Sequence, residues 1–324
     1  MKRTLGCSGI EVSALGMGCW AIGGPFWLDG KPVGWGRVDD DESVQAVHKA
    51  LDLGITFFDT ADVYGCGHSE TILGKALGHR REDVIIATKF GRVFDEEKKC
   101  ILGSKADPDH IRSACGNSLR RLGTDRIDLY QFHLGDYDPG QAAEVRDVLE
   151  ELVSAGKIRY YGWSTDDPER ARVFAAGDHC AAIQQAFNVF GGNDETLRLC
   201  EELNLASINR GPLAMGILTG KFSEDTTLPD DDLRSRFDFK RGVQADQLRS
   251  LDSIRKILTS EGRTLAQGAL AWLWARSGNT IPIPGFKTVQ QVSENAGAMR
   301  YGPLKADRMA EIDRFLGRSA ASSS

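Results

Sequence analysis

Short apolar runs rich in β-branched residues alternate with longer amphipathic segments, from about residue 14 to residue 300. Most of the short runs are too apolar to face water on either side, which is typical of parallel strands joined by crossover helices. The pattern predicts eight strands, at Ala14–Gly18, Ile55–Asp59, Val84–Lys89, Ile127–His133, Ile158–Ser164, Ala182–Gln184, Ala206–Arg210 and Thr280–Pro284. Eight buried parallel strands indicate closure into a (β/α)₈ TIM barrel of the α/β class.

Helical periodicity between the strands predicts helices at Asp41–Leu53, Ser69–Leu77, Asp107–Leu122, Gly140–Ser154, Asp194–Leu203, Thr264–Arg276 and Thr288–Ala298. Gly54, Gly123 and Gly156 follow three of these helices and are typical stop signals. The first twelve residues carry a Cys-Ser-Gly-Ile turn between two extended runs. This pattern predicts a β-hairpin that closes the bottom of the barrel.

Two long stretches, Gly23–Asp40 and Phe222–Gly242, lack any periodicity and are rich in Gly, Pro, Asp and aromatic residues. Loops of this length usually cover a site. No internal repeat and no low-complexity linker divides the chain. We therefore expect a single domain over residues 1–318, followed by a disordered tail at 319–324.

Composition narrows the range of partners. The chain of 324 residues has a net charge of -6, so it has no electrostatic preference for nucleic acid or an anionic membrane. Its start lacks the apolar core of a signal peptide, and no stretch approaches the ~20 apolar residues of a membrane span. We expect a cytoplasmic protein. Its oligomeric state is not evident from the sequence.

The seven cysteines and six histidines do not form a recognisable metal or disulfide pattern. The cysteines are scattered and never spaced as C-x-x-C, and the histidines form neither H-x-H nor H-E-x-x-H. We therefore expect neither a disulfide framework nor a metal site, and a metal-dependent hydrolase is disfavoured.

Ionisable residues end three successive predicted strands, at Asp59, Lys89 and His133, and Tyr64 follows in the loop after Asp59. Active sites of such barrels form at the C-terminal ends of the strands. Each residue has a simpler structural interpretation, as a helix cap, a strand end, a core histidine or a rim aromatic. Burying all four together is costly unless they satisfy one another or perform chemistry, so the sequence predicts a catalytic group.

Five segments resemble the signature segments of the aldo-keto reductase superfamily, in order: ITFFDTADVYGCGHSE, IIATKF, LYQFH, GPLAMGILTGKF and IPIPGFKTVQQVSEN. The likeness runs from about residue 3 to residue 316, and it is strongest to bacterial oxidoreductases that also resemble the potassium-channel β subunits. It implies NADPH-dependent reduction of an aldehyde or ketone by a tetrad of Asp59, Tyr64, Lys89 and His133.

The chemistry of carbonyl reduction agrees with these residue types. Hydride addition builds negative charge on the carbonyl oxygen, so a positioned acid must donate a proton, and Tyr64 would be that acid. A free phenol has a pKa near ~10, which an ammonium from Lys89, itself held by Asp59, would lower. His133 would hydrogen-bond the carbonyl oxygen and orient it.

A cofactor site is expected at the barrel mouth. Gly16-Met17-Gly18 lacks the third glycine of G-x-G-x-x-G, which disfavours a doubly wound dinucleotide fold. In PGFKTVQQVSEN a strand end leads through a basic residue into a helix N-terminus, a place that suits a phosphate. A capped surface helix with an incidental lysine is the alternative for that segment.

The resemblance implies that NADP lies extended across the mouth. Ser164 and Gln184 would hold the carboxamide, Gly18, Cys19 and Trp20 would line the nicotinamide, and Gly211, Pro212, Leu213, Gly216, Leu218, Gly220 and Lys221 would border the pyrophosphate. Lys287 and Thr288 would contact the 2′-phosphate, Gln291 and Asn295 would reach the adenine, and Asp59, Thr165, Arg210, Gly285 and Glu294 complete the predicted set.

Two positions depart from the common family pattern. Thr165 replaces the usual Asn after Ser164, and Arg210 replaces a Tyr that stacks on the nicotinamide in many members. A guanidinium also stacks on rings and pairs with phosphate, so the second position retains a suitable residue.

A regulatory NADP-binding subunit with little turnover is the alternative function, because the channel β subunits share the fold and the tetrad. The substrate and the preferred direction of reaction are not evident from the sequence. The first long loop contains Phe26, Trp27 and Trp35, whose rings either cover a ligand or pack on the barrel rim. If they cover a ligand, they favour a nonpolar or aromatic aldehyde, with sugars and their keto derivatives as the alternative.

Overall fold

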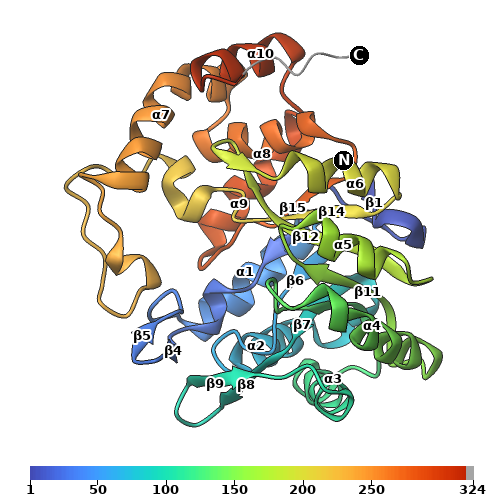
Figure 1. Ribbon diagram of the computed structural model, residues 1–324. Helices are drawn as coiled ribbons and strands as arrows, with labels where there is room; N and C mark the ends of the chain where they lie inside the picture. The colour runs from blue at the N-terminus through green and yellow to red at the C-terminus, as the bar shows by residue number, and fades with distance from the viewer. Residues whose placement is uncertain (319–324) are drawn as a thin grey trace.

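Eight parallel strands form a barrel at the centre of the computed structural model, which describes residues 1–318 (Figure 1). In chain order they are β3 (Met17–Gly18), β6 (Phe57–Asp59), β7 (Ile85–Phe90), β10 (Ile127–Phe132), β11 (Ile158–Ser164), β12 (Cys180–Asn188), β14 (Ala206–Arg210) and β15 (Thr280–Pro282), and each pairs with the next. A parallel bridge between Gly18 and Gly285 joins the last strand to the first. The predicted TIM barrel is confirmed, although the first strand is shorter than expected and β12 is longer.

A helix follows each barrel strand and lies outside the barrel: α1 (Asp40–Asp52), α2 (His68–Leu77), α3 (Pro108–Leu122), α4 (Pro139–Ser154), α5 (Pro168–Ala175), α6 (Asp194–Glu202), α8 (Leu265–Arg276) and α9 (Val289–Gly297). Two further helices, α7 (Gly242–Leu258) and α10 (Ala306–Phe315), pack against each other and against α8. The sequence prediction missed α5, α7 and α10. The start signal of α5 is present in the sequence, because Asp167 caps the helix and Pro168 opens it, but the helix is short and buries just Ala171 and Phe174. Helix α7 follows Arg241 and has no side-chain cap.

The predicted N-terminal hairpin is confirmed, with β1 (Lys2–Thr4) antiparallel to β2 (Glu11–Ser13). Leu5 and Val12 are buried in one cluster with Ala182 and Ile281 from the barrel strands. Gly6 has a φ of +53°, and a Cβ there would lie 2.1 Å from the carbonyl oxygen of Ala181. The hairpin therefore seats tightly on the N-terminal end of the barrel, as expected.

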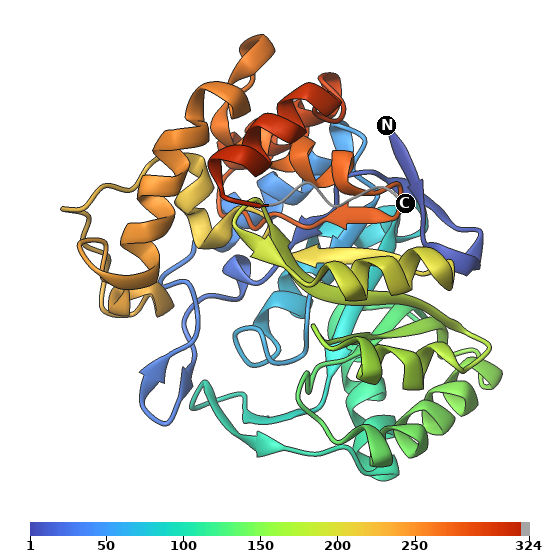
Figure 2. The ribbon, with the colours of Figure 1, turned by 45° about the horizontal axis from the view of Figure 1, so that its top comes forward.

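The loop predicted at Gly23–Asp40 is not wholly irregular. It contains β4 (Trp27–Leu28) and β5 (Lys31–Pro32), which form a four-stranded sheet with β9 (Cys100–Ser104) and β8 (Arg92–Asp95). Figures 1 and 2 show this sheet on the side of the barrel away from the N-terminal hairpin, the same side as the long segment before α7. Both long segments therefore lie at the mouth.

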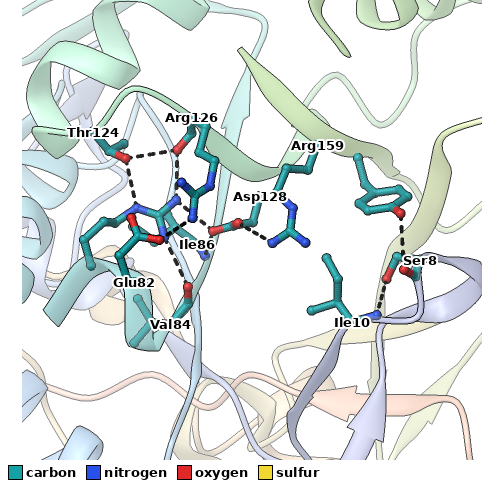
Figure 3. Close-up of polar contacts among 11 residues, drawn as sticks. Ser8, Ile10, Glu82, Val84, Ile86, Thr124, Arg126, Asp128 and Arg159 are labelled. Carbon is teal, nitrogen blue, oxygen red and sulfur yellow. Dashed lines mark hydrogen bonds and ion pairs between the residues drawn. The ribbon is translucent and has the colours of Figure 1, made fainter. Parts of the chain in front are cut away.

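Polar contacts hold the N-terminal ends of three barrel strands together (Figure 3). The buried Asp128 on β10 accepts hydrogen bonds from the Ile86 amide at 3.0 Å, from Arg81 at 2.8 Å and from Arg159 at 3.0 Å. Arg81 also donates to the carbonyl oxygen of Val84 at 3.1 Å. One carboxylate thus joins β7, β10 and β11 at the end opposite the mouth.

The predicted tail at 319–324 lies outside the described residues. Within residues 1–318, no helix combines the length and the apolar character that a bilayer crossing requires.

Candidate active site

The four residues that the sequence grouped together meet at the C-terminal ends of β6, β7 and β10. Asp59 ends β6, Lys89 lies in β7, and Tyr64 lies in the loop that follows β6. His133 directly follows β10, and its backbone amide donates to the carbonyl oxygen of Phe90 at 2.8 Å. Strand ends that converge on one rim are the usual position of an active site in this architecture.

A buried ion pair forms the base of this site. Lys89 Nζ lies 2.6 Å from Asp59 Oδ1, with 0% and 2% of the two side chains exposed. The same ammonium donates to the carbonyl oxygen of Thr60 at 2.7 Å and to the Tyr64 hydroxyl at 3.2 Å. All three ammonium hydrogens therefore have a partner, which offsets much of the cost of burying the charge.

Two glutamines satisfy the other oxygen of the carboxylate. Asp59 Oδ2 accepts hydrogen bonds from Gln131 Nε2 at 2.9 Å and from Gln184 Nε2 at 2.7 Å. The sequence analysis missed Gln131. Strand alternation could have found it, because Gln131 lies two residues before His133 and so faces the same side of the strand. Gln184 was expected to bind the cofactor carboxamide. Its Nε2 atom is used by Asp59 and Gln131, so its Oε1 atom is the one left for a ligand.

The pKa of Tyr64 corrects one expectation from the sequence. Burial raises the pKa of the phenol above its ordinary value of 10.0, and the neighbouring Lys89 ammonium offsets this increase without reversing it. The contact with Lys89 is as predicted, but the predicted direction of the pKa shift is wrong, because desolvation of the phenolate outweighs its attraction to the ammonium.

The imidazole of His133 is neutral. Burial, and next the positive charge of Lys89, hold the pKa of His133 well below its usual 6.5. Its ring packs edge-to-face against Tyr64 with centroids 5.8 Å apart, and its Nδ1 atom is buried without a hydrogen-bond partner in the described chain. A neutral ring with an unused nitrogen beside a phenol can bind a polar group on a ligand.

The position of Tyr64 depends on its neighbours. Trp20 stacks on the phenol ring with centroids 5.6 Å apart and an interplanar angle of 16°. Gly65 has a φ of +59°, and a Cβ there would lie 1.9 Å from the carbonyl oxygen of Gly23. The loop that carries Tyr64 therefore touches the loop that carries Trp20 through a contact of two glycines.

Not every predicted cofactor residue offers a side chain to a ligand. Cys19 is fully buried, and its backbone amide donates to the carbonyl oxygen of Asp59 at 2.7 Å. Leu218 is also fully buried within the core. Thr165 donates through Oγ1 to the carbonyl oxygen of Gly135 at 2.9 Å. Cys19 and Leu218 can therefore contact a cofactor through their backbones alone, and the Thr165 hydroxyl is already engaged.

The segment predicted at the pyrophosphate forms a tight irregular turn, η4 (Ala214–Thr219). Gly211, Gly216 and Gly220 all have positive φ there, with Gly216 at +98°. These glycines bring the backbone close to the mouth, where a bulkier residue would be strained. Pro212, Leu213 and Lys221 complete the predicted group at the same turn.

Three cations gather where the phosphates were expected. Burial and the nearby Arg234 guanidinium lower the pKa of Lys221, and burial lowers the pKa of Lys287. Arg234 is paired with Asp232, whose two oxygens lie 2.9 Å and 2.7 Å from its nitrogens. The sequence analysis missed Arg234, which lies in a segment without periodicity. The group carries more positive than negative charge, which suits a phosphate.

The two long loops are joined directly, in an arrangement that we call the clasp. Trp35 and Asp232 form an antiparallel backbone bridge, and the Leu233 amide donates to the carbonyl oxygen of Gly34 at 2.8 Å. Arg234 lies over the Trp35 ring, 4.4 Å from its centroid. The clasp thus links residues almost 200 positions apart in the chain.

Lys287 fastens the clasp to the barrel. Its ammonium donates to the carbonyl oxygens of Trp35 and Arg37. Two of the hydrogen bonds of Lys287 therefore already go to the backbone of the first loop, and its predicted contact with the 2′-phosphate stays a prediction.

The start of α9 is capped by its own side chains. The Thr288 hydroxyl oxygen accepts a hydrogen bond from the backbone amide of Gln291 at 3.2 Å, and the side-chain Oε1 of Gln291 accepts one from the backbone amide of Lys287 at 2.7 Å. Asn295 is buried, and its amide lies 3.5 Å from the carbonyl oxygen of Gly285. Thr288 and Gln291 therefore lie at the start of α9, whereas Asn295 and the partly exposed Glu294 lie in its last turn.

Arg210 is held by an ion pair at the mouth. Its guanidinium lies 2.5 Å from Asp166 Oδ2, and about half of its side chain is exposed. Asp166 in turn accepts a hydrogen bond from the backbone amide of Ala186 at 2.6 Å.

Within the described chain, no cluster of His, Cys, Asp and Glu has the arrangement of a metal site.

Comparison with known proteins shows the family of this chain. The model of the Aldo/keto reductase family matches residues 14–316. The aldo-keto reductase YhdN of Bacillus subtilis is 34% identical over 315 residues, covering 95% of this chain and 91% of the relative.

Solved structures of similar proteins agree with this result. The glycerol dehydrogenase AKR11B4 from Gluconobacter oxydans is 32% identical, with a TM-score of 0.83, covering 100% of this chain and 98% of that one. An aldo-keto reductase from Klebsiella pneumoniae in complex with NADPH is 26% identical, with a TM-score of 0.71 and the same coverage. The chain therefore belongs to the aldo/keto reductase family, as its sequence motifs implied.

Proposed function

We propose that this protein reduces an aldehyde or ketone to the alcohol with NADPH, and that Tyr64 donates the proton. The observation that carries the proposal is the 3.2 Å contact between the Tyr64 hydroxyl and a buried Lys89 ammonium, next to a neutral His133. A phenol in this position remains protonated at neutral pH, because burial raises its pKa. It is therefore a donor whose conjugate base is stabilised when it forms.

NADP(H) is the cofactor in this proposal. The Klebsiella relative binds NADPH, and the cationic group of Lys221, Arg234 and Lys287 in this chain suits a nucleotide with an additional phosphate. The glycine-rich turn at η4 would border the pyrophosphate, and Ser164 and Gln184 would hold the carboxamide. When bound, NADPH supplies the hydride.

The protein's own residues provide the remaining chemistry. His133 would hydrogen-bond the carbonyl oxygen and direct it toward Tyr64. Tyr64 transfers its proton to that oxygen as negative charge develops, and Lys89 stabilises the resulting phenolate. Asp59, fixed by Gln131 and Gln184, keeps Lys89 charged: burial disfavours the ammonium, but Asp59 and Tyr64 together raise the pKa of Lys89 above its ordinary value.

The test compares wild type with Tyr64→Phe in NADPH consumption over aldehydes, ketones, quinones and keto sugars. The variant should lose ~10²-fold or more in kcat for aldehydes, the scale of a lost general acid, with an unchanged NADPH dissociation constant. Quinones are an internal control, because their reduction depends less on proton donation in the hydride step. Undiminished rates in Tyr64→Phe would refute the role of Tyr64.

The alternative, a binding subunit with little turnover, makes a different prediction. Such a protein would bind NADPH but would not consume it with any compound of the screen. Multiple turnovers with one aldehyde are enough to exclude this alternative.

A further inference from the structure

A polar cleft of about 690 Å³ opens beside the tetrad at the same end of the barrel. Its lining comes from the segments that follow β7, β10, β11 and β12 and from the last residue of β14, namely Arg92, Gly135, Asp136, Thr165, Asp166, Asp167, Pro168, Arg170, Asn193 and Arg210. Gly135 lies two residues beyond His133, and Arg92 lies three residues beyond Lys89. A substrate whose carbonyl group is held at His133 would extend into this cleft.

The charges in the cleft are mostly paired. Arg210 is paired with Asp166, and Arg170 is paired with Asp167 and also donates to the carbonyl oxygen of Tyr137 at 2.9 Å. These contacts leave little of either guanidinium charge uncompensated. A ligand gains less from a cation that already has a carboxylate partner.

Arg92 differs from the other two arginines. It has no carboxylate partner within residues 1–318, and its NH1 donates to the hydroxyl of Ser104 at 2.9 Å. That bond orients the guanidinium and leaves its charge unpaired. Asp136 is the one carboxylate in the lining without an ion-pair partner among the described residues, and its side chain is exposed on the rim.

The positive charge of Arg92 acts on His133 of the tetrad. After burial and Lys89, the guanidinium groups of Arg92 and Arg210 also contribute to the low pKa of His133. The three arginines and three aspartates of the lining balance one another in number, but Asp166 and Asp167 are paired and Arg92 is not, so Arg92 is the cation that a negatively charged ligand would meet near the tetrad.

We propose that this cleft selects carbonyl substrates that carry an anionic group, a carboxylate or a phosphate, and that Arg92 binds that group. This inference rests on the proposed function and names its substrate class. Arg210, fixed by Asp166, also lines the cleft. The class differs from the nonpolar aldehyde that the aromatic loop residues favoured, since Phe26 is buried and Trp35 is engaged in the clasp.

The test uses two aldehydes of equal shape, 4-carboxybenzaldehyde and its uncharged analogue 4-formylbenzamide. Wild type should prefer the carboxylate by about tenfold or more in kcat/KM, the scale of one charge-assisted contact. Arg92→Gln should remove most of this preference, and Arg92→Lys should retain part of it, because the charge stays but the planar fork is lost. The preference should also decrease with ionic strength.

Two further variants sharpen the test. Asp136→Asn should increase the preference, because it removes the unpaired carboxylate from the lining. Arg112→Gln is the matched control: Arg112 lies in α3, lines a separate depression on the outside of the barrel and pairs with Glu151, so its loss should leave the ratio unchanged. A second pair, glyceraldehyde 3-phosphate and glyceraldehyde, applies the same comparison to a phosphate.

The outcomes separate this inference from the proposed function. A preference in either pair that Arg92→Gln removes supports the inference. Turnover of all the aldehydes without such a preference, or with a preference that survives Arg92→Gln, overturns it and leaves the proposed function in place. Failure of wild type to reduce any of these aldehydes would overturn the inference, whereas the proposed function fails if no compound of the wider NADPH screen is turned over.

Discussion

The Lys89 ammonium lies 3.2 Å from the Tyr64 hydroxyl, and both side chains are buried. The pKa of each group is raised, that of Tyr64 by burial and that of Lys89 by Asp59 and Tyr64 against the effect of burial. Both groups are therefore protonated at neutral pH. The proton that carbonyl reduction requires is already in place on the phenol.

This arrangement predicts the pH dependence of reduction. A general acid works while it is protonated, so kcat/KM should stay level from about pH 6.5 and fall above pH 10, as pH rises through the raised pKa of Tyr64. His133 is neutral over this range and should add no step. Initial rates with an aldehyde that does not ionise measure the profile. A fall centred near neutral pH would contradict the assignment.

Lys89→Met should nearly abolish reduction and leave NADPH affinity largely intact, because it removes the charge next to Tyr64. It also leaves Asp59 buried without its cation, which should lower the free energy of unfolding by about 3 kcal/mol. Gln131 and Gln184 continue to donate to Asp59, so the variant should still fold.

The double variant Lys89→Met with Asp59→Asn is the control for stability in this experiment. Removing both charges should recover part of the unfolding free energy in urea titrations without restoring activity. Wild-type kcat in a folded Lys89→Met sample would mean that the four residues do not act as a catalytic group.

Lys287→Ala should weaken NADPH binding by about 1.5–3 kcal/mol and NADH binding by less, because a charge-assisted contact to the 2′-phosphate is lost. Fluorescence titration of each nucleotide measures the difference. Lys305→Ala is a matched control, since Lys305 is exposed and pairs with Glu261. Equal weakening of both nucleotides would indicate that Lys287 acts solely by fastening the clasp.

Asp128→Ala should lower stability and spare catalysis. It removes three hydrogen bonds at the N-terminal end of the barrel and leaves the buried Arg81 without its carboxylate, a loss of about 3 kcal/mol. Asp128 lies at the opposite end of the strand from His133, so kcat at a temperature where the variant is folded should match wild type. A large loss of kcat without a change in melting temperature would be inconsistent with this division.

The sequence predicted the barrel and the meeting of the four polar residues because both depend on local pattern. Each strand is a short apolar run, and parallel strands in a closed barrel necessarily place their last residues on one rim. Asp59, Lys89 and His133 could therefore be brought together without knowledge of the packing. The sign of the pKa shift at Tyr64 could not be predicted, because it depends on how completely the phenol is buried.

The clasp and the role of Arg92 could not be predicted from the sequence. The bridge between Trp35 and Asp232 joins two segments without periodicity, and it depends on how the barrel positions both of them. Arg92 looks like an ordinary surface arginine until the ion pairs of Arg170 and Arg210 are known. The folded chain decides which of these three arginines lacks a carboxylate partner, so the sequence alone does not show it.

The clasp has a consequence for motion at the barrel mouth. Since Trp35 and Asp232 share a backbone bridge and Arg234 lies over the Trp35 ring, neither loop can move away alone without breaking both contacts, and the first loop must also break its hydrogen bonds from Lys287. Opening at this point is therefore one cooperative event rather than two independent loop motions. The Leu233 amide, which donates to Gly34 across the join, should exchange its hydrogen with solvent at the rate of that event.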